Sequence, residues 1–526
     1  MNFNSPIGYS KNPLPVTNVS FLDQVSSAGS EGTKDNRSQF QQPGNPKFSI
    51  LSLPLEIIIQ ITNYLDQFGI IALMKVNSHL YHVVRPQLYH TIVIEPKWSA
   101  FMKEFTSGVT YIKSSYNIKH LIQTDGSLIH KLIIKGLPDS LTFDSINDMM
   151  VKFCKNLQLT QLAWKPHFKL SFLDMNLSNL QTLDVDITED IFSGNLDFTV
   201  FKNLHNLRRL CIGPYTKMTV IRDIMRYIPS QVEVLQLTKH YKDLIEPVSK
   251  KLLIRHHEDL DYDLQEINDL RYIFPTTFEL KKLSLSGILV SSRQIQSFRI
   301  NFQSLTTFVL KATEFNFGGD SFLKELKFEN LKHLAIDYRQ GYQDYVPLFL
   351  SNHRSLTKLD LVIRINDTFP FNEDNYQIIN KLPLNALSVE LIQEKNLNWM
   401  NQPIRLSKLK FFRDLQLQSC RFNASNEETL EFIKYQPQLK LLEVFGLNAG
   451  GSPHFALSVL HPNVYDEWFK IQHVALIYFR ICPLDYIKLN HWIFERKSQK
   501  NTIEDSVIVE PRDGLEEWFD NRVRVL

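Results

Sequence analysis

The sequence has 526 residues and a formal net charge of +2, and 43% of its residues are hydrophobic. This length allows two to four ordinary domains or one long array of repeats, and the composition supplies enough apolar side chains for a large core. The small net charge argues against a protein that binds nucleic acid by bulk electrostatics. We therefore expect a globular chain without a nucleic-acid partner.

The four cysteines lie far apart and form no Cys-x-x-Cys pair. This usage indicates a reducing compartment, with neither a disulfide framework nor a zinc site. The amino terminus lacks a basic-then-apolar signal sequence, and no segment reaches the roughly eighteen apolar residues of a membrane span. We expect no membrane insertion and a cytoplasmic or nuclear location. Residues 1–46, rich in Ser, Asn, Gln, Gly and Pro, are predicted to form a disordered tail.

Residues 47–94 are predicted to form three short helices. Pro54 suits the first position of a helix. Ile57, Ile61 and Leu65 form an apolar stripe that the neighbouring isoleucines widen. The third helix is expected to be interrupted at Pro86. A unit of this size buries too little surface to fold alone, so it calls for protein on its far side.

These residues carry a resemblance. The run Leu53-Pro54-x-Glu56-Ile57-x3-Ile61-x2-Tyr64-Leu65, followed by Val76-Asn77-x2-Leu80-Tyr81 and Pro86-x-Leu88-Tyr89, resembles a fungal-type F-box. F-box proteins dock onto the Skp adaptor of SCF ubiquitin ligases, and the region after the F-box selects the substrate. The resemblance implies that adaptor-binding residues lie within this run: Leu53, Pro54, Ile57, Ile61, Leu65, Val76 and Leu80.

After this region, the pattern apolar-x-x-apolar-x-apolar recurs thirteen times, and eleven of the twelve steps between copies measure 21 to 32 residues. The copies are Ile129/Leu132/Ile134, Leu159/Leu162/Trp164, Leu180/Leu183/Val185, Leu207/Leu210/Ile212, Val232/Leu235/Leu237, Leu280/Leu283/Leu285, Leu305/Phe308/Leu310, Leu331/Leu334/Ile336, Leu356/Leu359/Leu361, Leu384/Leu387/Val389, Phe412/Leu415/Leu417, Leu439/Leu442/Val444 and Ile471/Val474/Leu476.

This pattern is the head of a leucine-rich repeat. The last two apolar positions lie two apart, so both point to one face of a short strand, and stacked units share one core. We predict an α/β fold, a leucine-rich-repeat solenoid of about 13 repeats over 95–500. The remaining step, 48 residues long, holds either a degenerate repeat or an inserted helical excursion near 239–275.

Signatures of nucleotide-binding loops, dinucleotide folds, zinc proteases and serine hydrolases are absent from the sequence. We predict a non-catalytic chain with no cofactor, metal or small-molecule substrate. The expected function is the substrate receptor of an SCF-type ubiquitin ligase, which contacts cullin through the adaptor and directs a target to proteasomal degradation. The alternative is a scaffold that binds the adaptor without ligase activity.

The target is expected on the concave face, where the residues around the last two apolar positions point outward. Early copies offer Lys131, Lys165, Asp184 and Asp186 there. Toward the carboxyl end the candidate substrate-binding residues form an apolar patch with an acidic rim. These candidates are Asp414, Leu441, Glu443, Phe445 and Ile477. The tail, 501–526, carries apolar residues that make it either a cap over this patch or a tail beside an open site.

Overall fold

The computed structural model divides into two compact units, 1–53 and 54–526. In the first unit it describes the short 3-10 helix Ile50–Ser52 and Leu53. The described residues are 50–96, 108–154, 157–165, 168–174, 177–187, 197–238, 277–286, 290–291, 300–311, 315–316, 328–339, 345–365, 373–393, 402–406, 409–445, 464–490, 492–496 and 506–509. The predicted tail 1–46, the insertion near 239–275 and most of 501–526 lie outside these ranges.

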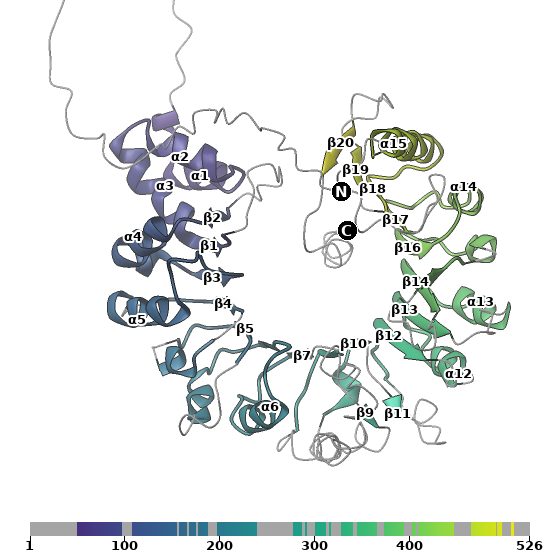
Figure 1. Cartoon of the computed structure of the whole chain (residues 1–526), viewed down its shortest axis with the longest axis horizontal. Helices are drawn as coiled ribbons and strands as arrows, with labels where there is room; N and C mark the ends of the chain where they lie inside the picture. The colour runs from purple at the N-terminus through teal and green to yellow at the C-terminus, as the bar shows by residue number, and fades with distance from the viewer. Residues whose placement is uncertain are drawn as a thin grey trace, which may run out of the picture. The chain divides into compact units, whose positions relative to one another are not determined.

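The second unit combines helices with one long sheet, so its class is α/β. Helices from α4 onward lie on one side of the sheet (Figure 1). The described helices are α1 (Leu55–Thr62), α2 (Gln67–Met74), α3 (Ser78–His90), α4 (Ser115–Asp125), α5 (Phe143–Phe153), α6 (Met218–Met225), α12 (Tyr345–Asn352), α13 (Glu373–Asn380), α14 (Asn426–Ile433) and α15 (Val464–Ile481).

Eighteen described strands belong to this sheet, and two more, β9 (Val290–Ser291) and β11 (Phe315–Asn316), pair separately. Its strands are β1 (Thr91–Ile94), β2 (Thr110–Ile112), β3 (Lys131–Ile134), β4 (Gln161–Trp164), β5 (Thr182–Val185), β6 (Arg209–Ile212), β7 (Val234–Thr238), β8 (Lys282–Ser286), β10 (Thr307–Lys311), β12 (His333–Arg339), β13 (Lys358–Ile365), β14 (Ala386–Gln393), β15 (Gln402–Ile404), β16 (Ser419–Asn423), β17 (Leu441–Phe445), β18 (Tyr486–Leu489), β19 (Trp492–Arg496) and β20 (Ser506–Val509).

Fifteen of these strands run parallel, in the spatial order β2, β1, then β3 to β18 in chain order without β9, β11 and β15. β15 pairs antiparallel with β14, and β19 and β20 extend the sheet antiparallel beyond β18. Parallel neighbours need a crossover between them, and the helices and 3-10 turns of each unit supply it. The result is one strand per repeating unit.

A ladder of main-chain hydrogen bonds joins each unit to the next. In the units from Ile129 to Leu439, the carbonyl of the residue after the first core position accepts two N–H groups of the following unit, at 2.7 to 3.2 Å, with Leu417 as the first core position of the β16 unit. For example, the Lys281 carbonyl accepts from Thr306 and Thr307, and the Lys332 carbonyl accepts from Thr357 and Lys358. This ladder fixes the stacking register independently of side-chain identity.

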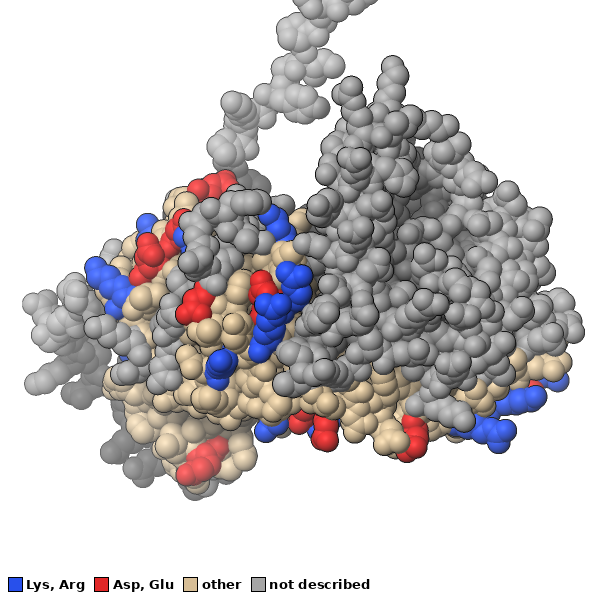
Figure 2. Space-filling view, turned by 90° about the horizontal axis from the view of Figure 1, so that it is seen from below, with Lys and Arg blue, Asp and Glu red and all other residues tan. Residues whose placement is uncertain are grey.

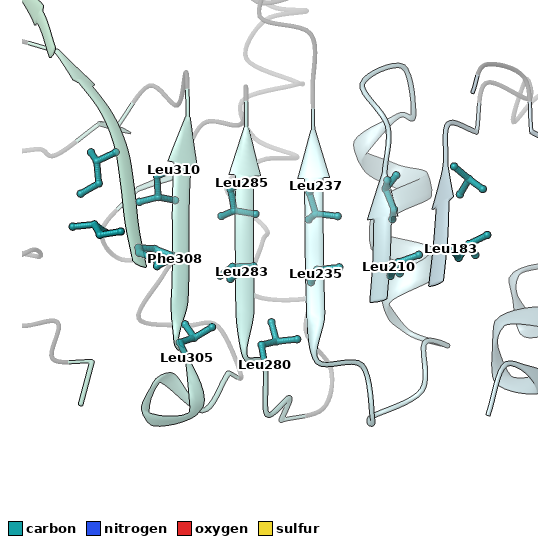
Figure 3. Close-up of a cluster of buried hydrophobic side chains, with 14 of the residues drawn as sticks. Leu183, Leu210, Leu235, Leu237, Leu280, Leu283, Leu285, Leu305, Phe308 and Leu310 are labelled. Atoms are coloured by element: carbon teal, nitrogen blue, oxygen red, sulfur yellow. The ribbon is translucent and has the colours of Figure 1, made fainter. Parts of the chain in front are cut away.

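The core lies between the sheet and the helices. Figure 3 shows the core side chains of neighbouring strands side by side in rows, with Leu235, Leu283 and Phe308 in one row. All three are essentially inaccessible to solvent, at 0 to 1% exposure. A single unit has no partner for these side chains, so stacking provides their burial.

Eleven of the thirteen predicted triplets coincide with strands, with their last two positions in the core. The other two are wrong. Phe412 ends a 3-10 helix, Leu409–Phe412, and the strand follows at Ser419–Asn423 with core positions Cys420 and Phe422. Here two triplet frames overlap at Leu417, and the ladder from Asn385 selects the second.

The last predicted triplet lies inside helix α15, where Ile471 and Leu476 pack as helical residues. The spacing of three between its first positions suits a helix as well as a strand. The final parallel strand is β18, with Ile487 and Leu489 in the core. One strand of the sheet, β1, was not predicted. It lies within the region predicted to be helical and carries Ile92 and Ile94 in the core.

The long step in the repeat spacing falls between two paired strands. β7 pairs directly with β8, and the Glu233 carbonyl accepts from Lys281 and Lys282. The residues near 239–275 lie outside the described ranges, so the insertion and the degenerate repeat both stay predictions.

The predicted interruption at Pro86 is also wrong, because α3 continues through Pro86 to His90. Proline removes one helical hydrogen bond. Val84 and Leu88 flank it on the buried face of the helix, with 0% and 5% exposure. Their packing outweighs the local preference, and α3 leads straight into β1 without a linker.

The core assignment predicts unequal effects of mutation within one unit. Leu334→Ala should lower the free energy of unfolding by about 2–5 kcal/mol, because it removes a side chain with 0% exposure from the stacked core. Lys332→Ala, at an exposed position in the same unit, should cost about 0.5 kcal/mol or less. Urea unfolding of both variants checks this, and equal losses would contradict the register.

Candidate interaction surfaces

The first candidate surface lies on α1, α2 and α3. Local capping defines the ends of these helices. The Asp66 carboxylate accepts from the Gly69 N–H at 2.7 Å, and the Asn77 side chain accepts from the Leu80 N–H at 2.8 Å. Both residues are favoured N-caps because their side chains satisfy amides that the helix leaves unpaired.

One side of this helical segment is buried. Ile58, Ile70, Leu80, Val84 and Leu88 are 0 to 5% exposed. These residues pack the helices together and against the start of the sheet. The sequence predicted that these helices need protein packed against them. The chain itself supplies part of that protein.

The three helices and the turns between them also carry exposed apolar side chains, and we call this set the apolar helix surface. It contains half of the exposed large apolar side chains that the structure describes from Pro54 onward. Its exposed fractions run from 37% for Tyr81 to 85% for Tyr64. The members of the apolar helix surface are Leu55, Ile57, Tyr64, Phe68, Val76 and Tyr81.

The predicted adaptor-binding residues divide into three groups. Pro54, Ile57 and Val76 are exposed on or beside the apolar helix surface. Ile61 and Leu65 are half-buried in the second unit, and Leu53 is half-buried in the first unit. Leu80 has 0% exposure, so its prediction as a contact residue is wrong, and it supports the helices from beneath.

Sequence reasoning missed four members of this surface, Leu55, Tyr64, Phe68 and Tyr81. Leu55 opens α1 and Phe68 lies in the first turn of α2, while Tyr64 lies between these helices. The predicted stripe was centred on Ile57 and Ile61, three to four residues apart. The position of Leu55, Tyr64 and Phe68 at helix starts and in a turn is a sequence signal for these three, and Tyr81 lies within α3.

The helices are joined to the sheet by polar contacts as well as by packing. The Gln67 side chain on α2 accepts from the Tyr111 N–H at 3.0 Å and donates to the Tyr111 carbonyl at 3.4 Å. It thereby pairs with the outer edge of β2 as a neighbouring strand would. Arg85 on α3 also forms an ion pair with Asp125, whose side chain is 7% exposed.

The second candidate surface is the face of the sheet that points away from the helices, which we call the opposite face. Its central row holds the residue between the last two core positions of each unit. From β12 to β18 this row reads Ala335, Asp360, Ser388, Arg421, Glu443 and Lys488, each paired with the next.

Burial divides the opposite face. On β4 and β5 the row residues, Ala163 and Asp184, are half-exposed, and Asp184 pairs with Lys165 at 2.8 Å. Toward β17 and β18, Glu443 and Lys488 are 2% and 3% exposed. In this central row the residues of β3 to β5 are half-exposed, whereas Ser284, Val309 and Ala335 in the middle of the sheet are buried, as Glu443 and Lys488 are at its carboxyl end.

Burial overturns two of the five predicted substrate-binding residues. Leu441 and Glu443 point to the opposite face as predicted, but they are 0% and 2% exposed and offer no surface to a target. Phe445 is half-buried, with the Arg421 guanidinium 5.7 Å from its ring centre. Ile477 lies half-buried in α15, and Asp414 is exposed in a turn before β16.

The predicted cap is described at 506–509 alone. There the tail forms β20, which adds an antiparallel strand beside β19 through pairs such as Phe494 and Ile508. This strand extends the edge of the sheet. The rest of the predicted cap lies outside the described residues.

Charged groups on the covered part form a buried ion pair. The Lys488 ammonium contacts the Glu443 carboxylate, and both side chains are 3 to 4% exposed. The Arg421 guanidinium lies 3.4 Å from the other carboxylate oxygen. The two cations offset the cost of removing this carboxylate from water.

Asp186 was also predicted on the accessible face, and this prediction is wrong because it is 1% exposed. Its carboxylate accepts from the Tyr215 N–H at 2.9 Å and the Thr216 hydroxyl at 3.0 Å. Gly213 makes room for it, since a Cβ there would lie 2.8 Å from the Asp186 side chain. Burial raises the pKa of this carboxyl, and the hydrogen bonds oppose that rise.

Buried nucleophiles and histidines belong to the core. Burial raises the pKa of the Cys154 thiol to about 11 and that of Cys482 to about 12, which disfavours the reactive thiolate. His353 is 1% exposed and accepts from the Phe328 N–H at 3.0 Å, and burial lowers its pKa. Among the described residues, no group of three or more His, Cys, Asp and Glu side chains is placed to hold a metal ion.

Lysine, arginine and acidic side chains are intermingled on the face drawn in Figure 2. This mixture agrees with the small net charge of the chain. Within the described part of the chain, no helix combines the length and the apolar character needed to cross a bilayer.

Comparisons with known proteins give likenesses among solved structures alone. A scan against protein families finds no match, and no curated protein matches the chain. Among solved structures, the chain is similar to the leucine-rich repeat-containing protein LegL7 from Legionella pneumophila, with 11% identity and a TM-score of 0.27. The match covers 68% of this chain and 94% of LegL7, and a likeness at this score supports no argument about function.

The buried ion pair predicts a strong effect of removing one charge. Lys488→Met should lower the free energy of unfolding by about 3–5 kcal/mol. It leaves the Glu443 carboxylate buried with Arg421 as the remaining cation of the two. Adding Glu443→Gln should recover part of this loss, since no buried carboxylate then remains. Urea unfolding of the single and double variants checks the coupling, and equal stabilities of the wild type and Lys488→Met would contradict it.

Proposed function

We propose that this chain is the substrate-recognition subunit of an SCF-type ubiquitin ligase. In this proposal α1, α2 and α3 form an F-box that binds the Skp adaptor and, through it, cullin. The repeating sheet forms a leucine-rich-repeat solenoid that holds a target protein. The observation that carries the proposal is the apolar helix surface.

Exposing these apolar side chains to water is unfavourable in free energy. Fully burying one large apolar side chain contributes about 1.5–3 kcal/mol. Six such side chains stand between 37% and 85% exposed within Leu55–Tyr81, so a partner gains substantially by covering them. Concentrations of exposed apolar side chains of this kind mark protein interaction sites. Tyr64 and Tyr81 add a residue type that is enriched among binding hot spots.

The joint between these helices and the sheet suits a receptor that acts by position. Gln67 pairs with the main chain of Tyr111, and Arg85 pairs with Asp125, so α2 and α3 are each fixed to the elements that follow. A bound target would therefore sit at a fixed place relative to a bound adaptor. Its contribution to ubiquitin transfer is a raised effective concentration of target lysines near the conjugating enzyme.

The alternative is an adaptor-bound scaffold without ligase activity. It uses the same apolar helix surface, so the same observation supports it. Cullin separates the two: a receptor should co-purify with adaptor and cullin, whereas a scaffold should co-purify with adaptor alone.

The proposal predicts that charges on the apolar helix surface abolish adaptor binding. Tyr64→Asp combined with Val76→Asp should reduce co-purification of a Skp adaptor by at least about tenfold, because it places carboxylates within the buried part of the interface. The matched control is Tyr435→Asp, which changes a tyrosine that is 49% exposed far along the chain.

Quantitative immunoblotting of the purified chain measures both variants, and their melting temperatures report on folding. Retained adaptor in the double variant, or equal loss in the Tyr435 control, would overturn the F-box assignment.

A further inference from the structure

Basic residues gather at one level of the sheet. The level is formed by the two residues between the first and second core positions of each unit. In six consecutive units, on β6, β7, β8, β10, β12 and β13, these pairs read Arg208-Arg209, Glu233-Val234, Lys281-Lys282, Thr306-Thr307, Lys332-His333 and Thr357-Lys358. We call this set the basic band.

The band has clear limits. The two units before it carry Thr-Gln and Gln-Thr at the same level, at 160–161 and 181–182. The two units after it carry Asn-Ala and Gln-Ser, at 385–386 and 418–419. With histidine neutral, the band holds six cationic residues and Glu233, and Asp360 lies beside its last unit. Counted together with Asp360, the formal charge at this level is +4, against +2 for the whole chain.

The main-chain ladder holds these residues in one line. The carbonyls of Arg208, Glu233, Lys281, Thr306 and Lys332 each accept from both band residues of the next unit. Neighbouring strands lie about 4.8 Å apart, so the five steps from β6 to β13 span about 24 Å. An extended peptide of about seven residues covers this distance.

The band is open to solvent where it is most basic. The side chains of Arg208 and Lys281 are 56% and 61% exposed, and Lys332 is exposed. Glu233 contacts both Arg208, at 3.7 Å, and Lys281, at 2.7 Å. Three exposed cations of the band, Arg208, Lys281 and Lys332, outnumber this one carboxylate. The band therefore keeps a positive potential that faces solvent.

We propose that the basic band is the docking site for an extended acidic segment of the target protein. This inference rests on the proposed receptor function and adds the chemistry of its target. The carboxylates of the segment would alternate with the cations of β6, β8, β12 and β13. Electrostatic matching of this kind sets register and association rate.

The interspersed carboxylates favour a protein over a nucleic acid. Glu233 lies within the band, and Asp360 contacts His333 and Lys358 at its end. A continuous phosphate backbone would meet these carboxylates at close range, whereas a peptide places uncharged residues there. A nucleic acid bound through the same residues is therefore an outcome that the experiment must distinguish.

The test uses the full chain and a fluorescent octaglutamate peptide as the probe. Arg208→Gln, Lys281→Gln and Lys332→Gln together should weaken peptide binding at least about tenfold, and raised salt should weaken wild-type binding. The control combines Lys381→Gln, Lys410→Gln and Lys434→Gln, which removes the same charge from exposed lysines elsewhere. It should change the affinity by no more than about twofold.

Fluorescence anisotropy reads each result. Equal weakening in the two triple variants, or no binding of octaglutamate to the wild type, would overturn the proposal. Tighter binding of a labelled oligothymidylate through the same three residues would also overturn it. Adaptor co-purification should be unchanged in the band variant, so failure of the band and failure of the receptor function are separate results.

Discussion

The main-chain ladder is the constraint on which the rest of the structure depends. Each unit donates two N–H groups to one carbonyl of the unit before it, from His130 to Lys440. Because the donors are main-chain groups, the ladder tolerates any side chain at these positions. The register is therefore kept while the side chains vary, from apolar Leu441 to a run of cations between Arg208 and Lys358. A repeating backbone thus provides a fixed platform for a variable surface, which is the physical basis of recognition by stacked repeats.

The three helices at the start of the second unit solve two problems at once. The first unit of a stack has no unit before it to cover its core. The buried sides of α1, α2 and α3 pack at this end, and Val84 and Leu88 lie on the buried side of α3. Gln67 also satisfies the edge of β2, which would otherwise present unpaired main-chain groups. These short helices bury part of their apolar side chains in this packing, and the others stay exposed to solvent. The apolar helix surface follows from this division, and the proposed adaptor interface makes use of it.

Sequence reasoning predicted the strands well wherever three signals agreed: an apolar triplet, the usual spacing and a partner in register. It placed Leu334 and Leu359 in the core, where both are 0% exposed. It failed where one pattern fits two structures. The overlapping frames at Leu417 are decided by hydrogen bonds to a distant unit, and the triplet at Ile471 suits a helix equally well. It also placed Leu441 on the correct face of the sheet but did not predict that Leu441 is buried. Burial depends on the other residues that pack against that face.

The central claim is that one chain binds the adaptor through its first helices and presents its sheet to a target. Hydrogen–deuterium exchange of the full chain, with and without a Skp adaptor, tests this claim most directly. The account predicts slower exchange at the amides of α1, α2 and α3 when the adaptor is bound, with unchanged exchange at Lys281 and Thr306 of the ladder. Protection confined to the sheet, or no protection of these helices, would contradict it.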